Sequence, residues 1–401
     1  MHTAQDVGPI AYIALDKGYV VLAVELVHKA VGYEIAVSGG ELHNGGFLDE
    51  YFVAFPVLLQ VTDRDGGNAE AVSEGQKLIG AHHGAVIAHD LAAEATFLKT
   101  CQAAQVNGGL GVAAALEHDG EAIGLFRSEF LFMDSPALPS EEEQFAAYQK
   151  VAIAMKGAPV IIRTLDVGGD KDIPYLHMEK EENPFMGFRA VRYCLENADQ
   201  YKVQLRALLR ASAFGDVEIM VPLVTCVEEV RAVKALVEEC KAELDAEGIA
   251  YNKDVKVGVM METPAASLIA DKLAKEADFF SIGTNDLIGY TMCADRGNDH
   301  ISNLYSVYYP AVLRSIKNII ECGVKEGIMV GMCGEAASDP LLEPLLISFG
   351  LDEFSMSAPS VLRARKTISQ WSKWECDELA DKALACTTAE EVKAILEAAA
   401  R

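Results

Sequence analysis

The pattern of apolar and polar residues changes near residue 100 of this chain. Beyond that point, short apolar or β-branched runs alternate with long stretches of helical periodicity, which is typical of repeated βα units and a parallel sheet. The stretch 227–247 illustrates the helical period, because Val230, Val233, Val237 and Leu244 recur on one face with charged residues between them.

Eight such runs predict eight strands, with amphipathic helices between them. Eight parallel strands with helical returns favour an α/β fold of the closed (β/α)8 TIM barrel type. The alternative is an open doubly wound sheet, which usually carries a glycine fingerprint after its first strand, and none is convincing here. The expected strands are 103–107, 122–128, 159–166, 217–224, 255–262, 279–285, 328–334 and 353–357, and the expected helices are 140–156, 185–214, 226–247, 264–276, 310–326 and 339–349.

The same pattern predicts three regions. Residues 1–100 hold glycine-rich patches and short apolar runs without a clean helical period, so they are expected to be a short, poorly patterned N-terminal region. Residues 101–375 are expected to form the barrel. Residues 376–401 are helical and acidic, and they are expected to pack outside the barrel as a tail.

Charge and cysteine content narrow the class of protein. Lys and Arg total 34 against 60 Asp and Glu, a formal net charge of −26. This argues against nucleic acid or an anionic membrane as a partner, because each needs a basic surface. The nine cysteines include no C-x-x-C pair, and neither a membrane-spanning apolar run nor a secretory leader is recognised. We therefore expect a reduced, cytoplasmic protein without a disulfide framework or structural zinc.

Charged residues gather where the predicted strands end, in the sequences LFRSE, IIRTLD, VMMETP, IGTNDL and GMCGE. In a barrel the carboxyl ends of the strands converge on one face, where active sites are built. One such charge alone is typically a solvated loop residue, but five strand ends together indicate a site. We expect that site to contain Arg127, Glu129, Arg163, Asp166, Glu262, Asn285, Asp286, Cys333 and Glu335.

The residue types indicate the chemistry of this site. Arg127 and Arg163 offer planar, permanently charged forks for a phosphate or carboxylate, and Arg189 and Arg296 are candidates to join them. Such a group of arginines favours an anionic, phosphorylated substrate. Phosphoryl transfer, which depends mainly on positioning and charge neutralisation, is then the expected reaction class.

Two carboxylates and one thiol complete the predicted site. Glu262 and Asp286 follow adjacent predicted strands, and two carboxylates with water and substrate oxygens usually hold Mg²⁺. Carbon–carbon lyases that act on 2-keto acids share such a metal site, so they stay an alternative. Cys333 is either a buried core cysteine or a proton donor to a carbon atom, a task that suits a thiol pKa of about 8.5.

The motifs resemble one family in order and spacing over roughly residues 105–370. That family is the phosphoenolpyruvate–protein phosphotransferases, the enzyme I of the bacterial sugar phosphotransferase system, and the resemblance is to their phosphoenolpyruvate-binding barrel. Pyruvate phosphate dikinase and phosphoenolpyruvate synthase share the barrel, but the sequence LFRSEFLF is more similar to enzyme I. The matching segments include GLFRSEFLFMDSPALPSEEEQF (124–145), IIRTLDVGGDKDIPYL (161–176), VGVMMETPAASLIAD (257–271), DFFSIGTNDLIGYTMCADRGN (278–298) and VGMCGEAASDP (330–340).

The resemblance implies a role for each matching position. It implies Mg²⁺ bound by Glu262 and Asp286, and Cys333 as the acid that protonates the enolate carbon to give pyruvate. It also implies a homodimer and a phosphocarrier protein as partner. The residues implied for the phosphoenolpyruvate clamp are Arg127, Arg163, Asn285 and Arg296, with Lys171 and Arg189 near the phosphoryl group.

The family first passes the phosphoryl group to a histidine in an N-terminal swivelling domain. The nearest match to that histidine's motif is AHHGAVIAHDLA (81–92), which makes His83 the candidate phosphoacceptor, although Ala81 and His82 replace the expected Thr and Ser. Residues 61–71 and His43 are weaker candidates. The alternative is that residues 1–100 are a degenerate remnant, because they show no set of amphipathic helices able to dock the carrier.

Three hypotheses follow for the function. The first is an Mg²⁺-dependent phosphotransferase that uses phosphoenolpyruvate and releases pyruvate. The second is a barrel that binds phosphoenolpyruvate without passing the phosphate on. The third is the Mg²⁺-dependent 2-keto-acid lyase, which is disfavoured because four arginines exceed what a simple keto acid needs.

Overall fold

A computed structural model describes residues 10–15, 18–23, 25–29, 32–36, 101–106, 109–168, 173–176 and 178–401. The chain divides into two units, Met1–Thr96 and Phe97–Arg401. His83, His43, the segment 61–71 and Lys171 lie outside the described residues.

Two antiparallel strand pairs make up the described part of the first unit. Strand β1 (Ile10–Leu15) pairs with β2 (Gly18–Ala23), and β3 (Glu25–Lys29) pairs with β4 (Gly32–Ala36). The sequence pattern predicted no strand here. The reason is that runs such as IAYIAL and GYVVLA lack the strict alternation of apolar and polar residues by which a half-buried strand is recognised.

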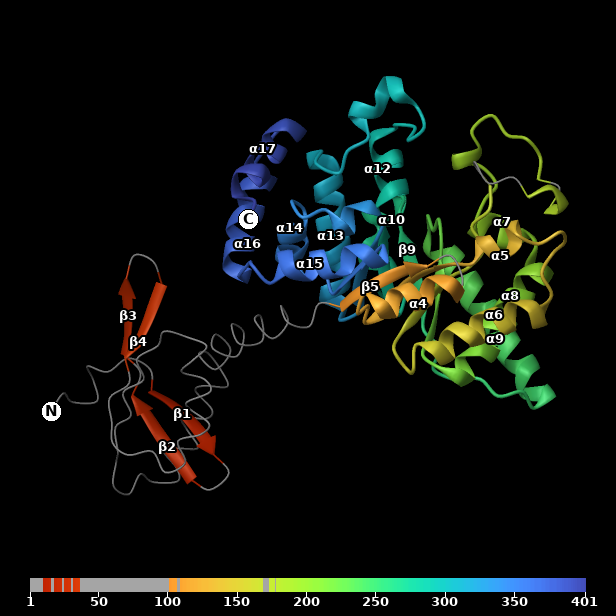
Figure 1. Cartoon of the computed structure of the whole chain (residues 1–401), viewed down its shortest axis with the longest axis horizontal. Helices are drawn as coiled ribbons and strands as arrows, with labels where there is room; N and C mark the ends of the chain where they lie inside the picture. The colour runs from red at the N-terminus through yellow and green to blue at the C-terminus, as the bar shows by residue number, and fades with distance from the viewer. Residues whose placement is uncertain are drawn as a thin grey trace. The chain divides into compact units, whose positions relative to one another are not determined.

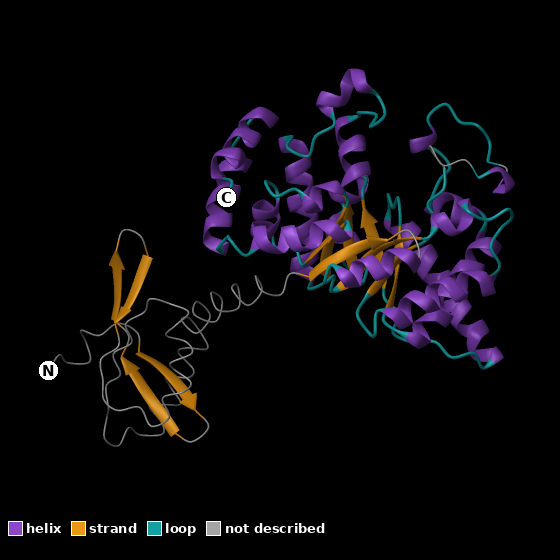
Figure 2. Cartoon of the chain, in the orientation of Figure 1, coloured by secondary structure: helices purple, strands orange, loops and turns teal. Residues whose placement is uncertain are grey.

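Eight parallel strands of the second unit close into a barrel, in the order β10-β11-β12-β5-β6-β7-β8-β9. This confirms the predicted TIM barrel, and the orange strands lie inside a ring of purple helices in Figure 2. Each strand begins within two residues of its predicted start, and three strands, β7, β8 and β10, end two or more residues earlier than predicted. The strands are β5 (Cys101–Val106), β6 (Ala122–Arg127), β7 (Val160–Arg163), β8 (Val217–Val221), β9 (Val257–Met261), β10 (Phe279–Gly283), β11 (Met329–Cys333) and β12 (Glu353–Met356).

Helices cover the outer surface of the barrel, and α14 to α17 lie together on one side of it (Figure 1). Local sequence sets their ends. Helix α6 begins with a capping box in which Ser140 Oγ accepts from the Glu143 backbone N–H at 3.3 Å. Helix α13 begins at Pro310 and is followed by Gly327 at φ 74°, a left-handed conformation that glycine adopts without strain.

The helices of the second unit are α4 (Gly109–Glu117), α5 (Glu129–Met133), α6 (Glu141–Ala154), α7 (Val191–Glu196), α8 (Ala198–Ala211), α9 (Val227–Glu247), α10 (Pro264–Leu268), α11 (Ala270–Leu273), α12 (Thr284–Met292), α13 (Pro310–Glu326), α14 (Glu343–Phe349), α15 (Val361–Ile368), α16 (Lys373–Leu384) and α17 (Ala389–Ala399). Short 3-10 helices link them at η2 (Pro174–Leu176), η3 (Pro184–Met186), η4 (Ser212–Phe214), η5 (Asp299–Leu304), η6 (Glu335–Ser338) and η7 (Ala358–Ser360).

Two hydrophobic cores hold the barrel together. The larger one lies between the strands and the surrounding helices, and it includes Phe126, Ile162 and Phe280. The smaller one fills the barrel interior with inward-facing side chains, as in other TIM barrels. Its members are Leu125, Ile161, Met220, Met260, Phe279 and Cys333.

Candidate active site

The polar residues predicted at the strand ends lie at the carboxyl end of the barrel, here called the mouth. Arg127 ends β6 and Arg163 ends β7, and the two are register partners on these adjacent parallel strands. Cys333 ends β11, Glu262 follows β9, and Asp286 lies in the first turn of α12. The topology therefore brings together residues that are far apart in the sequence, as expected for a barrel.

Arg127 and Arg163 form a pair of positive charges at the mouth. The Arg127 Nη2 donates to Gln105 Oε1 at 3.0 Å, and Gln105 Nε2 donates to the Ser355 carbonyl at 2.7 Å. Burial, followed by the positive charge of Arg163, lowers the pKa of Arg127. Two like charges held this close favour an anion between or beside them.

Acidic neighbours stabilise the charge of Arg163. Its Nη2 is paired with the buried Glu129 at the start of α5, and its Nη1 lies 3.3 Å from Asp166 Oδ2. Burial acts to lower the pKa of Arg163, but Glu129, Asp166 and Glu262 outweigh it and raise the pKa above its ordinary value. Arg163 Nε is buried and has no hydrogen-bond partner among the residues that the structure describes.

Arg189 links two acids across the mouth. Its Nη2 donates to Asp166 Oδ1 at 2.8 Å and to Asp286 Oδ2 at 3.2 Å. Its Nη1 lies 3.4 Å from the Tyr290 hydroxyl of α12. Burial opposes the charged form, but the negative charges of Asp166 and Asp286 raise the pKa of Arg189 overall. The resemblance had implied a place near a phosphoryl group for Arg189, and the structure adds that the guanidinium orients both carboxylates.

Glu262 is buried at the centre of these charges. Its Oε1 accepts from the Leu223 backbone N–H at 2.6 Å. Leu223 has φ 58°, a left-handed conformation that costs about 1 kcal/mol or more for a non-glycine residue, and it presents this N–H to the carboxylate. Burial and the negative charges of Asp286 and Asp166 raise the pKa of Glu262, against the opposing effect of Arg163 and Arg189.

Cys333 lies deeper, inside the barrel, where its thiol is buried. Ser281 of β10 donates from Oγ to the Cys333 Sγ at 3.4 Å. Burial raises the pKa of this thiol to about 11, so the thiol is protonated at neutral pH. A buried, protonated thiol below the charged mouth fits the predicted proton donor as well as it fits a core cysteine.

The two remaining residues predicted for the clamp, Asn285 and Arg296, lie at the rim of the mouth. Arg296 Nη2 lies 2.5 Å from Glu335 Oε1, and their side chains are 56% and 78% exposed. The charge of Arg296 still reaches Arg127, because it contributes to the lowered pKa of that residue. Asn285 is the second residue of α12, and its carbonyl accepts from the Tyr305 hydroxyl at 2.8 Å.

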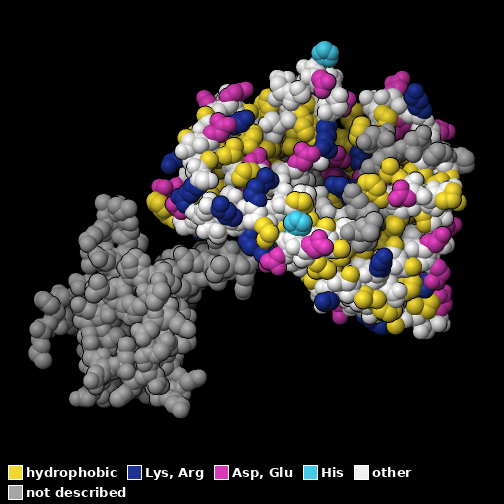
Figure 3. Space-filling view, viewed as in Figure 1, with side chains coloured by type: hydrophobic (Ala, Val, Ile, Leu, Met, Phe, Trp, Pro, Cys, Tyr) yellow, Lys and Arg dark blue, Asp and Glu magenta, His cyan; other side chains and the backbone are white. Residues whose placement is uncertain are grey.

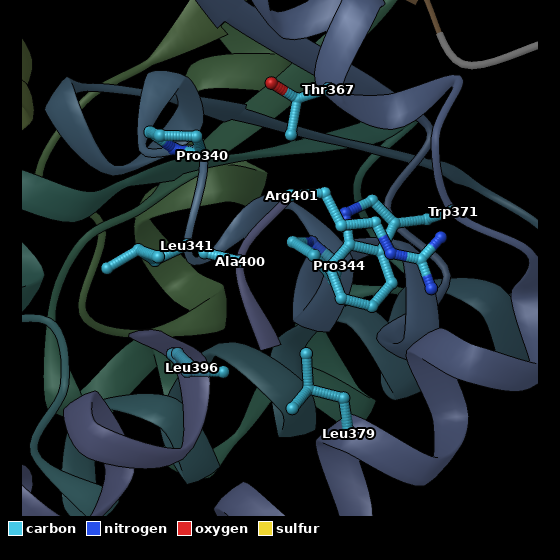
Figure 4. A pocket seen from close by; sticks show the side chains of 9 residues that line it. All are labelled: Pro340, Leu341, Pro344, Thr367, Trp371, Leu379, Leu396, Ala400 and Arg401. Atoms are coloured by element: carbon cyan, nitrogen blue, oxygen red, sulfur yellow. The ribbon is translucent and has the colours of Figure 1, made fainter. Parts of the chain in front are cut away.

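Acidic and basic side chains surround a hollow in Figure 3, between the regions that Figure 1 labels α12 and α7. A separate cavity of about 100 Å³ lies among the C-terminal helices, lined by residues such as Pro340, Leu379 and Leu396 (Figure 4). The guanidinium of Arg401 there stacks over the Trp371 ring at 4.3 Å and pairs with Glu375. This mostly apolar cavity lacks the acids, thiol and arginine cluster of the mouth.

Comparison with known proteins assigns the family. Residues 88–373 match the family described as "PEP-utilising enzyme, PEP-binding domain", where PEP is phosphoenolpyruvate. The chain belongs to the PEP-utilising enzymes. The resemblance inferred from the sequence is thereby confirmed for the barrel.

Individual PEP-utilising relatives are more than half identical to this chain over the barrel. The phosphoenolpyruvate-protein phosphotransferase of Priestia megaterium is 52% identical over 281 residues, which is 70% of this chain and 49% of the relative. That of Bacillus subtilis (strain 168) is 52% identical over 285 residues, 71% of this chain and 50% of the relative. The chain therefore spans about half the length of the curated relatives it matches.

Solved structures match less closely. A citrate lyase from Burkholderia xenovorans LB400 has a TM-score of 0.44 and 15% identity, covering 75% of this chain and 91% of that chain. This likeness is too low to bear on the function of a PEP-utilising enzyme.

Two site residues of this PEP-utilising barrel were missed by the sequence analysis. Gln105, which holds Arg127, is a polar residue near the end of the predicted strand 103–107, and that position was a usable signal. Ser281, which contacts Cys333, lies inside an apolar run, and only the barrel closure brings it to the thiol. In the described part of the chain, no group of three or more His, Cys, Asp or Glu is arranged as a metal site. Nor is any described helix both long and apolar enough to cross a membrane.

Proposed function

We propose that this chain binds phosphoenolpyruvate at the barrel mouth and acts as a phosphoenolpyruvate–protein phosphotransferase. The phosphoryl group would pass to a histidine and then to a phosphocarrier protein of the sugar phosphotransferase system, with release of pyruvate. The relatives that carry this name support the proposal over the matched half of their length.

One observation carries the substrate assignment: the pair of like charges formed by the half-buried Arg127 and the buried Arg163. The pKa of Arg127 is lowered by burial and by the charge of Arg163, so a bound phosphate would relieve both effects. The buried Arg163 Nε, which has no partner among the described residues, is a donor available for a substrate oxygen. Arg296 at the rim and Asn285 on α12 would complete the clamp.

The mouth also suits Mg²⁺. Glu262 and Asp286 would hold the ion, because carboxylate oxygens are its preferred protein ligands. Burial and the neighbouring acids raise the pKa of Glu262, which marks an excess of negative charge that a divalent cation would neutralise. When bound, Mg²⁺ would supply charge neutralisation for the substrate oxygens. Water and substrate would provide the remaining ligands.

Cys333 is the proposed acid in the second half of the reaction. Loss of the phosphoryl group from phosphoenolpyruvate leaves an enolate, and protonation of its methylene carbon gives pyruvate. The Cys333 thiol carries a proton at neutral pH, because burial raises its pKa to about 11. Its position below the arginine pair supports transfer to a substrate held at the mouth.

The phosphoacceptor and the partners remain predictions from the resemblance. His83 is the proposed acceptor, Lys171 the proposed additional contact to the phosphoryl group, and both lie outside the described residues. The carrier protein and a homodimer are the proposed protein partners. Light scattering on the purified chain would test the dimer, with twice the monomer mass of 43.2 kDa as the expected result.

The experiment that tests this function uses phosphoenolpyruvate carrying a labelled phosphate, with Mg²⁺ and added carrier protein. We expect acid-labile, base-stable label on the chain and one pyruvate for each phosphate transferred. His83→Ala should lose the label, whereas His118→Ala, a partly buried histidine that contacts the Ala114 carbonyl, should keep it. Mg²⁺-dependent binding without label or pyruvate would contradict phosphotransfer and favour a binding module.

A further inference from the structure

A second buried acid lies inside the barrel, below Cys333 and away from the mouth. Glu353 is the first residue of β12, and it is only 5% exposed. Two inward-facing glycines make room for its side chain. A Cβ atom at Gly124 would stand 1.8 Å from Glu353 Oε1, and one at Gly331 would stand 3.3 Å from Glu353 Oε2. The barrel interior is thus shaped around this carboxyl group.

Ser355 lies on the same strand as Glu353 and level with Cys333 on the next strand. It faces the barrel interior two residues after Glu353, and it is the register partner of Cys333 on the adjacent strand. A Cβ atom at Gly124 would stand 2.7 Å from Ser355 Oγ and 1.8 Å from Glu353 Oε1. The two oxygens therefore border the same small space. Both oxygens are buried and have no hydrogen-bond partner among the described residues. Glu353, Ser355 and Cys333 therefore occupy neighbouring inward positions on β12 and β11.

The charged groups around Glu353 are mostly acidic. The negative charges of Glu218 on β8 and of Asp352 act on Glu353, and Cys333 lies above it on the adjacent strand β11. Glu218 in turn pairs with Lys256, whose Nζ lies 2.5 Å from Glu218 Oε1. On β5, the backbone register partner of Glu353 is Cys101.

Such surroundings keep the carboxyl group neutral. Burial first, and then the negative charges of Glu218 and Asp352, raise the pKa of Glu353 to about 8. The Cys333 thiol has a higher pKa, about 11, so a proton would move from the Glu353 carboxyl group to a Cys333 thiolate spontaneously.

We propose that Glu353 returns the proton to Cys333 through the Ser355 hydroxyl after each protonation of the enolate. This inference rests on the proposed function, because Cys333 must lose its proton to substrate. Glu353 acts through Cys333 and does not contact the substrate itself.

The proton movements balance at each atom. The Cys333 S–H bond breaks as the C–H bond of pyruvate forms, and a thiolate remains. The Ser355 O–H proton then moves to sulfur, while the Ser355 oxygen takes the proton of Glu353. The Glu353 carboxylate regains a proton from water at the opposite end of the barrel, where Glu218 meets Lys256, whose side chain is 54% exposed.

The first test measures the Cys333 thiol itself and needs neither substrate nor metal. The full chain is alkylated with iodoacetamide at several pH values, and the peptide containing Cys333 is quantified by mass spectrometry. Above its pKa the Glu353 carboxylate opposes a nearby thiolate, so Glu353→Gln should move the alkylation midpoint to lower pH. At pH 9 we expect alkylation to be about 3- to 10-fold faster than in wild type, the change that a shift of about 0.5–1 pKa unit produces.

Glu343→Gln is the matched control for this measurement. Glu343 is also buried, and burial raises its pKa to about 8, but it lies in α14 outside the barrel strands. In the Glu343→Gln variant, Cys333 should be alkylated with the same pH midpoint as in wild type. An unchanged midpoint in Glu353→Gln, or an equal shift in both variants, would overturn the proposal.

The second test follows deuterium entering the methyl group of pyruvate in D₂O with Mg²⁺, by proton NMR. Wild type and Glu343→Gln should exchange, and Cys333→Ala should not. Glu353→Gln and Ser355→Ala should exchange at least about 10-fold more slowly with unchanged pyruvate affinity, as expected when proton delivery is lost. Thermal unfolding confirms that each variant is folded.

The outcomes separate the two proposals. If wild type exchanges and Glu353→Gln exchanges at the same rate, the relay is wrong and the proposed function stands. If wild type does not exchange at all, the proposed function and the relay both fail.

Discussion

At the mouth of the barrel, Glu129 and Asp166 are buried against arginines, whereas at the opposite end Glu353 is buried against Glu218 and Asp352. Glu129, Asp166 and Glu353 belong to the same barrel, and each is at most 5% exposed. The difference lies in the partner. An arginine keeps a buried carboxylate charged, and acidic neighbours keep a buried carboxyl group protonated. One end is thus prepared to bind an anion and the other to store a proton.

Removing an arginine from the mouth should have the largest effect. Arg163→Met would leave Glu129 buried without its cation, which should lower the free energy of unfolding by about 3–5 kcal/mol. Arg231→Ala is the control, because Arg231 is 66% exposed and pairs with Glu276 at the surface. That variant should change the free energy by at most about 1 kcal/mol. Urea unfolding measures the free energy of unfolding of both variants. Equal losses in the two would contradict the expectation that a buried ion pair costs more to break than an exposed one.

Crowding the opposite end should have the next largest effect. Gly124→Ala would place a Cβ 1.8 Å from Glu353 Oε1 and 2.7 Å from Ser355 Oγ. We expect a loss of about 1–3 kcal/mol, the usual result of overpacking a core. Gly297→Ala, where the nearest atom would be 3.6 Å away, should be close to neutral in the same unfolding assay. An unchanged free energy of unfolding in Gly124→Ala would show that the space around Glu353 is not tightly packed.

The pH dependence of stability sharpens the comparison further. Glu353 has a pKa of about 8 in the folded protein and about 4.3 in the unfolded chain. Between these two pH values, the folded chain keeps a proton at Glu353 that the unfolded chain has lost. This group therefore lowers stability as the pH rises through that window, by up to about 1.4 kcal/mol per pH unit. Below the window it has no effect.

Glu353→Gln should remove this contribution. Its stability relative to wild type should increase from pH 4.5 to 8 and then level off, as followed by chemical unfolding at each pH. A constant difference would mean that Glu353 titrates in the folded protein as it does in the unfolded chain.

The rim of the mouth should give the smallest effect on stability. Arg296→Ala removes an exposed partner of Glu335, so the midpoint of thermal unfolding should hardly change. Its affinity for phosphoenolpyruvate should fall, because the charge of Arg296 reaches Arg127. A large stability loss would show that the rim is part of the packed core.

The mouth could be predicted from the sequence and the opposite end could not. The mouth residues come at the ends of apolar runs, so the strand topology alone brings them together. They are Arg127, Arg163, Glu262, Asp286 and Cys333. Glu353 carries no such signal, because its environment depends on Gly124 and Gly331 from two other strands. The buried, acidic surroundings of Glu353 can be recognised only from the closed barrel.

Element boundaries show the same limit. The predicted strand 159–166 ends at Arg163, because Thr164 to Asp166 continue the chain past the ladder into the site. The predicted helix 185–214 is divided into η3, α7, α8 and η4, with the break between the two α-helices at Asn197. Apolar periodicity identifies an element, whereas its ends depend on hydrogen bonds to distant residues.

Calorimetric titration of the full chain with phosphoenolpyruvate, with and without Mg²⁺, tests most directly whether the mouth binds this substrate. The account predicts Mg²⁺-dependent binding at one site per chain. Arg127→Ala should weaken it at least about tenfold, a loss of about 1.4 kcal/mol or more, while Arg231→Ala should bind like wild type. Absence of Mg²⁺-dependent binding, or equal affinity in Arg127→Ala and wild type, would contradict the account.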